Sequence, residues 1–176
     1  MRWLTFTLAL ALTFPACLPA FAEVRDPHSH FFMAKMGDFK DELATAKREG
    51  KQGVLVMFEM DDCPFCARMK ANVLNQSQVQ DYFRKHFLIY DLDVKGDTSM
   101  LDFKGKETTE KAFALEQRAR ATPVFMFFDL EGNAVTRFTG ATQTVEEFLL
   151  LGRYVVEGVY KTNVPFNVYK KQGKPQ

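Results

Sequence analysis

The chain has 176 residues, of which 47% are hydrophobic and 26% charged, and its formal net charge is +1. This length and composition allow one globular domain with a buried core. The nearly balanced charge provides no basic patch of the kind by which proteins bind nucleic acid, so that class of function is excluded.

The first 22 residues have the pattern of a secretory signal peptide. Arg2 gives a short positive region, residues 4–14 are apolar, and Ala20-Phe21-Ala22 is an A-x-A cleavage site. An apolar run of this length is too short to span a bilayer comfortably. We therefore expect removal of residues 1–22 and a periplasmic protein, with lipoprotein anchoring at Cys17 as the alternative.

Beyond the cleavage site, helical and strand patterns alternate. Residues 23–37 are expected to form an irregular lead-in, residues 93–106 a polar loop, and residues 161–176 a loosely held tail. Apolar residues at helical spacing predict helices, and short continuous apolar runs predict buried strands. The predicted helices are 38–48, 64–73, 78–85, 108–118 and 145–159, and the predicted strands are 53–58, 87–92, 124–128 and 134–138.

This order predicts a three-layer α/β domain over residues 38–160, with a central mixed sheet, flanking helices and an N-terminal helical extension. Strand–helix–strand units favour parallel pairing with right-handed crossovers. The last two strands are joined by the tight turn Glu131-Gly132-Asn133 and are expected to form an antiparallel hairpin.

The run Cys63-Pro64-Phe65-Cys66 follows a predicted buried strand and begins a predicted helix, with Cys63 as its N-cap. A helix N-terminus lowers the pKa of a thiol, so we predict Cys63 as the nucleophile and Cys66 as the resolving thiol of disulfide exchange. A disulfide between them would close a two-residue gap and stabilise the fold little.

A zinc site is the alternative interpretation of two cysteines at this spacing. Structural zinc needs four ligands, and a signal peptide that carries away Cys17 leaves no second cysteine pair. His28 and His30 precede the predicted domain, and His86 stands at the start of a strand. We therefore expect neither a metal nor any other cofactor.

The sequence resembles thioredoxin-fold proteins over residues 38–158, through the two cysteines and through Thr122-Pro123 before another buried strand. The resemblance implies a cis-proline at Pro123 that faces the cysteines, and a substrate-binding role for Thr122, Pro123, Pro64 and Phe65. More narrowly, the chain resembles periplasmic thioredoxin-related proteins of the SoxW type, through Phe58-Glu59 and residues 118–123 and 154–160.

Two positions depart from ordinary thioredoxins. Met57 stands where those proteins have a buried Asp, and Asp62 stands where they have a Trp. Glu59 is the ionisable side chain of the preceding strand and is a candidate proton relay to Cys66; the alternative is a strand-end carboxylate in water. Asp61 and Asp62 should raise the pKa of the Cys63 thiol, with Arg68 as a partial offset, which favours a reducing couple.

These observations predict a periplasmic thiol–disulfide oxidoreductase that reduces disulfides of secreted proteins. The resemblance implies a membrane dithiol donor that recharges it, and we expect a monomer. One alternative is a Dsb-type thiol oxidant or disulfide isomerase. Another is a redox-linked assembly chaperone for metal or haem proteins.

Overall fold

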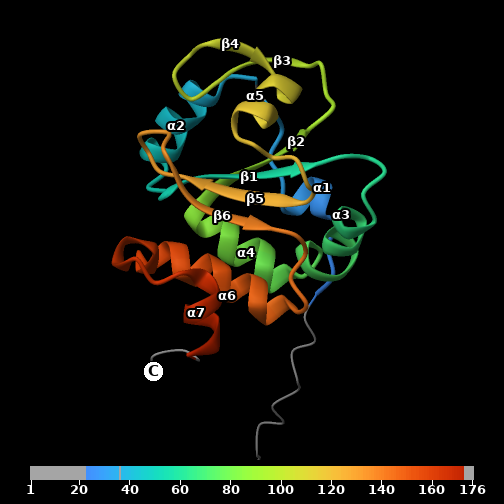
Figure 1. Ribbon diagram of the computed structural model, residues 1–176, viewed down its shortest axis with the longest axis vertical. Helices are drawn as coiled ribbons and strands as arrows, with labels where there is room; N and C mark the ends of the chain where they lie inside the picture. Colours follow the sequence, from blue (N-terminus) through green and yellow to red (C-terminus); the bar gives the residue numbers. More distant parts are fainter. Residues whose placement is uncertain (1–22, 36, 173–176) are drawn as a thin grey trace, which may run out of the picture.

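A four-stranded sheet forms the centre of the computed structural model, which describes residues 23–35 and 37–172 (Figure 1). The strands lie in the order β2-β1-β5-β6. β1 and β2 are parallel, whereas β5 is antiparallel to both of its neighbours. The predicted α/β class with a central mixed sheet is therefore confirmed. The strand bounds are Gly53–Glu59 for β1, Phe87–Asp93 for β2, Val124–Phe128 for β5 and Ala134–Thr139 for β6.

β5 runs opposite to the parallel direction that the order of elements favours. β2 ends at Asp93 beside Glu59, and β5 begins at Val124 beside Phe58, so both lie at the carboxyl end of β1. Between them, the helix α5 (Glu110–Glu116) has seven residues and a length of about 10 Å, about half that of a seven-residue strand. The connection thus returns the chain to the end of the sheet that it left, and β5 runs back antiparallel.

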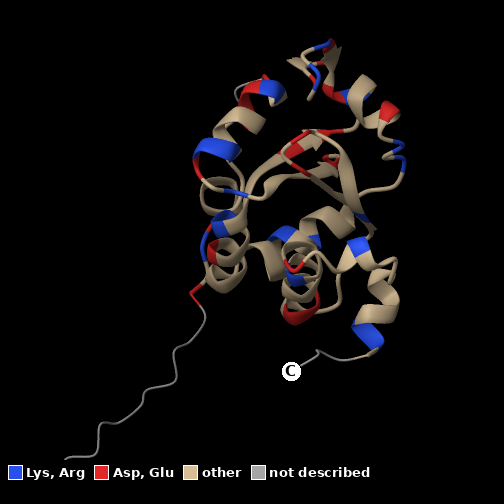
Figure 2. Ribbon diagram, turned by 90° about the vertical axis from the view of Figure 1, so that its left-hand side faces the viewer, with Lys and Arg blue, Asp and Glu red and all other residues tan. Residues whose placement is uncertain are grey.

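Helices cover both faces of the sheet: α2 and α5 lie on one face, and α3, α4 and α6 on the other (Figure 1). Each face has its own cluster of buried hydrophobic residues. Both Lys and Arg and Asp and Glu are distributed over the molecule, as expected from the balanced charge (Figure 2). The other helical bounds are Pro27–His30 for α1, Phe39–Arg48 for α2, Pro64–Met69 for α3, Ser77–His86 for α4, Val145–Val156 for α6 and Phe166–Lys171 for α7, with a π-helical turn η1 at Lys70–Leu74 and a 3-10 turn η2 at Val159–Thr162.

β1 is buried on both sides, and its side chains alternate between the two clusters. Val56 and Phe58 point to the face covered by α2 and α5. Met57 points to the opposite face, where it shares a cluster with Cys63 and Cys66. The two cysteines that follow β1 therefore lie on the same side of the sheet as Met57.

Most of the predicted helices begin close to the N-cap residues that the structure shows. Asp38 Oδ1 accepts hydrogen bonds from the N–H groups of Lys40 and Asp41, which confirms it as an N-cap. The predicted helix 145–159 ends earlier, at Val156, because Gly158 takes a left-handed conformation with φ of 70°.

The segment 93–106, predicted as a loop from its polar sequence, contains a short strand. β3 (Ser99–Leu101) pairs antiparallel with β4 (Glu107–Thr109), so the expectation of a plain loop is wrong. Asp102 holds the turn between them, since its carboxylate accepts the N–H groups of Lys104 and Lys106 at 2.8 and 2.9 Å. Strands of three residues are too short to show a two-residue hydrophobic period.

The lead-in is irregular outside α1, but it packs tightly on the domain. Phe31 and Phe32 are buried in the same cluster as the cysteines. The N–H of Met33 donates to the carbonyl of Ile89 at 2.8 Å, along the outer edge of β2. The lead-in is thus part of the domain's core and covers a sheet edge that would otherwise be open.

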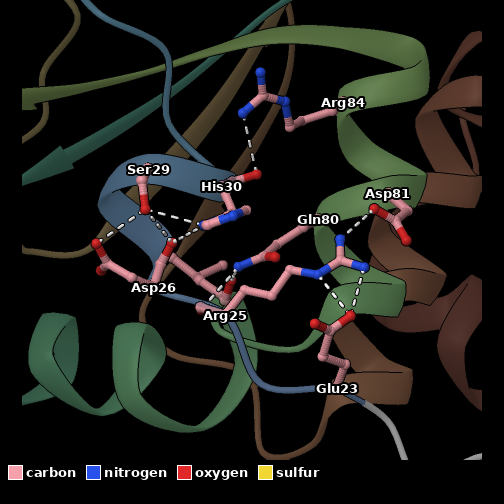
Figure 3. A network of polar contacts seen from close by, with 9 residues as sticks. Glu23, Arg25, Asp26, Ser29, His30, Gln80, Asp81 and Arg84 are labelled. Atoms are coloured by element: carbon pink, nitrogen blue, oxygen red, sulfur yellow. Dashed lines mark hydrogen bonds and ion pairs between the residues drawn. The ribbon is translucent and has the colours of Figure 1, made fainter.

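A polar network ties the start of the lead-in to α4 (Figure 3). The guanidinium of Arg25 forms ion pairs with Glu23 at 2.8 Å and with Asp81 at 2.9 Å. Gln80 Nε2 donates to the Arg25 carbonyl, and Arg84 donates to the carbonyl of His30. The ion pairs of Arg25 are at the surface and contribute little to stability, whereas Gln80 is buried.

The Lys-rich sequence after Lys161 predicts a loosely held tail, but the described part of this segment is docked on the domain. It contains α7, which lies against α6 (Figure 1). The side chain of Tyr169 is buried in the hydrophobic cluster, and its ring centroid lies 5.4 Å from that of Tyr154 on α6. The expectation of a loose tail is therefore wrong, because Tyr169 anchors the segment.

The predicted signal peptide, with Cys17, lies outside the described residues, as do residues 36 and 173–176. Over the described ranges, no helix combines the length and the hydropathy that a membrane crossing requires.

Candidate functional site: a dithiol at a helix N-terminus

Cys63 caps the N-terminus of α3. Its backbone is extended, Pro64 occupies the first helical position, and Cys63 Sγ accepts a hydrogen bond from the N–H of Cys66 at 3.2 Å. The N–H of Cys63 donates to the carbonyl of Met60 at 3.2 Å, which closes a turn between β1 and the helix. The predicted N-cap is confirmed, and the sulfur lies where the helix dipole favours negative charge.

The loop before β5 forms the opposite wall of the site. The Thr122–Pro123 peptide bond is cis, as the resemblance implies. The thiol of Cys63 donates to the carbonyl oxygen of Thr122 at 3.3 Å. The Thr122 hydroxyl is buried and has no hydrogen-bond partner within the described part of the chain. The structure therefore brings Cys63, Cys66, Thr122 and Pro123 together.

The pKa values of the two thiols are shifted in opposite directions. Burial raises the pKa of Cys63, but hydrogen bonds from the Cys66 thiol and from the N–H groups of Cys66 and Phe65 outweigh it, so this pKa lies below its ordinary value. Burial, and then the hydrogen bond with Cys63, raises the pKa of Cys66 to about 12. Both cysteines are free thiols. Cys63 is therefore the more acidic of the two thiols.

The prediction that Asp61 and Asp62 raise the pKa of the Cys63 thiol is wrong. Asp61 and Asp62 are exposed at the tip of the turn, and the side chain of Asp62 is 91% exposed, 4.0 Å from Lys95 Nζ. Water screens such charges, and the pKa of Cys63 is lowered instead of raised. Arg68 does not contact the sulfur either, because its guanidinium lies over the Phe65 ring at 5.2 Å from the centroid.

Glu59 lies at the end of β1 on the same face as Met57, with a side chain only 14% exposed. It accepts a hydrogen bond from Lys70 Nζ at 2.7 Å, and none links it to either cysteine among the described residues. Burial raises the pKa of Glu59 above its ordinary value, although the ion pair with Lys70 opposes this. The interpretation as a free carboxylate in water is therefore wrong.

Lys70 is the residue of this region that sequence reasoning overlooked. It begins η1, directly after α3. A π-helical turn of this kind often stands next to functional sites. Its position four residues after Cys66 was the available signal, because residues at this spacing share one face of a helix.

No three side chains of the metal-binding types His, Cys, Asp and Glu come together within residues 23–35 and 37–172. The chemistry that the described site offers is that of its two thiols.

Comparisons with known proteins agree with this geometry. A thioredoxin-fold protein from Helicobacter pylori superposes with a TM-score of 0.56 and 19% identity, covering 70% of this chain and 80% of that one. The oxidoreductase DsbH gives 0.57 and 14%, covering 87% and 96%. A thioredoxin from Thermus thermophilus gives 0.53 and 27%, covering 68% and 84%.

A search of curated proteins gave no match. The family model described as a thioredoxin-like domain matches residues 39–155, well over half of the sequence and including both cysteines and Pro123. The chain therefore belongs to the family of thioredoxin-like domains.

Proposed function

We propose that this protein is a thiol–disulfide oxidoreductase that reduces disulfides of secreted partner proteins. The observation that carries the proposal is the position of Cys63 Sγ, which caps a helix N-terminus at 3.2 Å from the N–H of Cys66. That position favours the thiolate that attacks a disulfide. The neighbouring thiol of Cys66 supplies the second half of the reaction.

In the first step, the Cys63 thiolate attacks one sulfur of the partner's disulfide. A bond forms between Cys63 and that sulfur, and the partner's other sulfur leaves as a thiolate. In the second step, Cys66 loses its proton and attacks Cys63 Sγ, which releases the partner's second thiolate. The partner gains two electrons, and the Cys63–Cys66 disulfide forms.

The cellular setting is proposed from the sequence. The signal peptide pattern supports a periplasmic location, and a membrane dithiol donor would return the two electrons after each cycle. A monomer suffices, because both thiols and the cis-proline loop come from one chain.

A thiol oxidant or isomerase of the Dsb type is the second candidate. The lowered pKa of Cys63 favours it, since a stabilised thiolate makes the dithiol a weaker electron donor. The acidic pair that should have opposed this lowering does not do so.

A redox titration of residues 23–176 against glutathione separates the two candidates. A reductant should have a midpoint of about −250 mV or lower, close to that of thioredoxin, and should reduce a protein disulfide in the presence of a dithiol donor. A midpoint of about −120 mV, together with net oxidation of a reduced client, would contradict the reductase and support the oxidant.

Glu59 is proposed as the proton acceptor for Cys66. A group that binds this proton must have a pKa near the working pH, and burial moves the pKa of Glu59 upward in that direction. Glu59 and Met57 lie on the same face of β1, so the carboxyl is one pleat beyond the position that thioredoxins use. A water molecule between the two groups would complete the path.

Glu59→Gln should slow the second step at neutral pH by at least about tenfold, because the amide cannot accept the proton. Stopped-flow reaction with dithiobis(nitrobenzoate) separates the steps: attack by Cys63 releases one aromatic thiolate, and attack by Cys66 releases the other. The first phase should be nearly unchanged.

Glu147→Gln is the matched control for this substitution. Glu147 is 13% exposed and pairs with Lys170 at 2.8 Å, far from the cysteines in sequence. Its second phase should match the wild type. Equal second phases in Glu59→Gln and wild type across the pH range would remove Glu59 from the mechanism while leaving the oxidoreductase intact.

A further inference from the structure

Phe65 lies between the two cysteines and faces solvent. Its side chain is 52% exposed, although most of the other phenylalanines described are buried in the two hydrophobic clusters. Exposing an aromatic ring to water is unfavourable, and an exposed ring contributes little to the stability of the fold. It does offer an apolar surface to any peptide whose sulfur reaches Cys63.

Arg68 covers one side of this ring and keeps its charge available. It stands one turn after Phe65 on α3, and its guanidinium lies 5.2 Å from the ring centroid, a cation–π geometry. Arg68 is exposed and forms no ion pair or side-chain hydrogen bond with any other residue that the structure describes. A carboxylate brought to this helix face would therefore meet an unpaired cation.

The opposite side of Cys63 carries the opposite charge. Asp61 and Asp62 form the tip of the turn that precedes α3, and both are exposed. The nearest cation to Asp62 is Lys95 at 4.0 Å, which leaves the pair largely uncompensated. Two exposed carboxylates thus precede the buried Cys63 in the chain, and the exposed Phe65 ring and Arg68 guanidinium follow it on α3.

The spacing of these groups suits an extended peptide. Arg68 stands five positions after Cys63, the N-cap of α3, which corresponds to a rise of about 7.5 Å. An extended chain covers this distance in two to three residues at about 3.3 Å each. Because successive side chains of an extended chain point to opposite sides, a peptide held at Cys63 would turn the second side chain after its cysteine back towards this surface, at about the distance of Arg68.

We propose that Arg68, whose guanidinium lies over the Phe65 ring, selects partner segments in which the second residue from the reactive cysteine, in one chain direction, is acidic. This inference rests on the proposed thiol–disulfide exchange and names its substrate class. The preference is directional at low salt, because Asp61 and Asp62 then repel a carboxylate that approaches the turn before Cys63. Arg68 acts on specificity through the partner's carboxylate, and the sulfur chemistry remains with Cys63.

Short peptide disulfides test this preference. One series is Gly-Cys-Phe-Glu, Gly-Cys-Phe-Gln and Gly-Cys-Phe-Lys, each carrying thionitrobenzoate on its cysteine, and a second series has the reversed order. The Cys66→Ser form is used, so that release of the aromatic thiolate reports only attack by Cys63. In at least one chain direction, the Glu peptide should react about fivefold faster than the Lys peptide at low salt. The ratio should fall towards one at high salt.

Arg68→Glu in the same Cys66→Ser background should reverse the order of the Glu and Lys peptides. The control is Arg48→Glu, which makes the same change of charge at an exposed position of α2. It should keep the original order. Because each result is a ratio between peptides, a general change in the reactivity of Cys63 cancels.

The outcomes separate this inference from the function on which it rests. Equal rates for the three peptides in both directions, or an unchanged order in Arg68→Glu, would overturn the proposed selectivity while exchange itself continues. Absence of reaction with every peptide would instead contradict the thiol–disulfide exchange.

Discussion

Replacing Cys63 by Ser is expected to abolish thiol–disulfide exchange, with a loss of rate of at least about three orders of magnitude. A serine hydroxyl stays protonated at neutral pH and does not attack sulfur. Cys66 cannot substitute for it, because the pKa of its thiol is raised to about 12. The measurement is the stopped-flow release of aromatic thiolate described above.

Cys66→Ser is the matched control for this loss. It should retain the fast first phase, lose the second, and accumulate a stable mixed disulfide on Cys63 that mass spectrometry detects. The first-phase rate should reach half its maximum below the ordinary pKa of a thiol, since the pKa of Cys63 is lowered. Retention of the first phase in Cys63→Ser, with its loss in Cys66→Ser, would reverse the two roles.

Phe31→Ala is expected to lower the free energy of unfolding by about 3–5 kcal/mol, the usual cost of truncating a buried Phe. The side chain is 0% exposed, although it belongs to the lead-in that precedes α2. Its ring centroid lies 5.1 Å from that of Phe32, 5.9 Å from that of Phe83 and 6.2 Å from that of Phe148. The lead-in therefore completes the cluster that also holds both cysteines.

Urea unfolding of residues 23–176 measures this change, with Phe65→Ala as the control. The Phe65 ring is half exposed, so its removal should alter stability by less than about 1 kcal/mol. A loss below about 1 kcal/mol in Phe31→Ala as well would mean that the lead-in is not docked in solution. Residues 38–160 alone would then be the folding unit, as the sequence suggests.

Most of the fold follows from local sequence patterns. The four strands of the sheet are continuous apolar or alternating runs, and the helices begin at recognisable caps such as Asp38 and Cys63. The dithiol was predictable for the same reason. A cysteine followed by Pro64 after a buried strand forms a helix N-cap through contacts within a few residues.

The features that sequence patterns missed depend on contacts between distant segments. Tyr169 turns a Lys-rich tail into a docked helix, because its ring meets that of Tyr154 on α6. Similarly, nothing in the sequence near Asp61 and Asp62 shows that they extend into water, where their charges are screened. Their expected effect on Cys63 failed for that reason.

The sequence by itself determined the α/β class, the helix N-cap at Cys63 and the position of the second cysteine three residues later. These depend on hydrophobic periodicity and on capping, which act within one or two turns of chain. Only the tertiary structure showed the contacts made in this region: the Cys63 thiol with the Thr122 carbonyl, Glu59 with Lys70, and the Arg68 guanidinium with the Phe65 ring. Burial and contacts between separate elements set the acid strengths of the two thiols, and these arise only when the layers pack together.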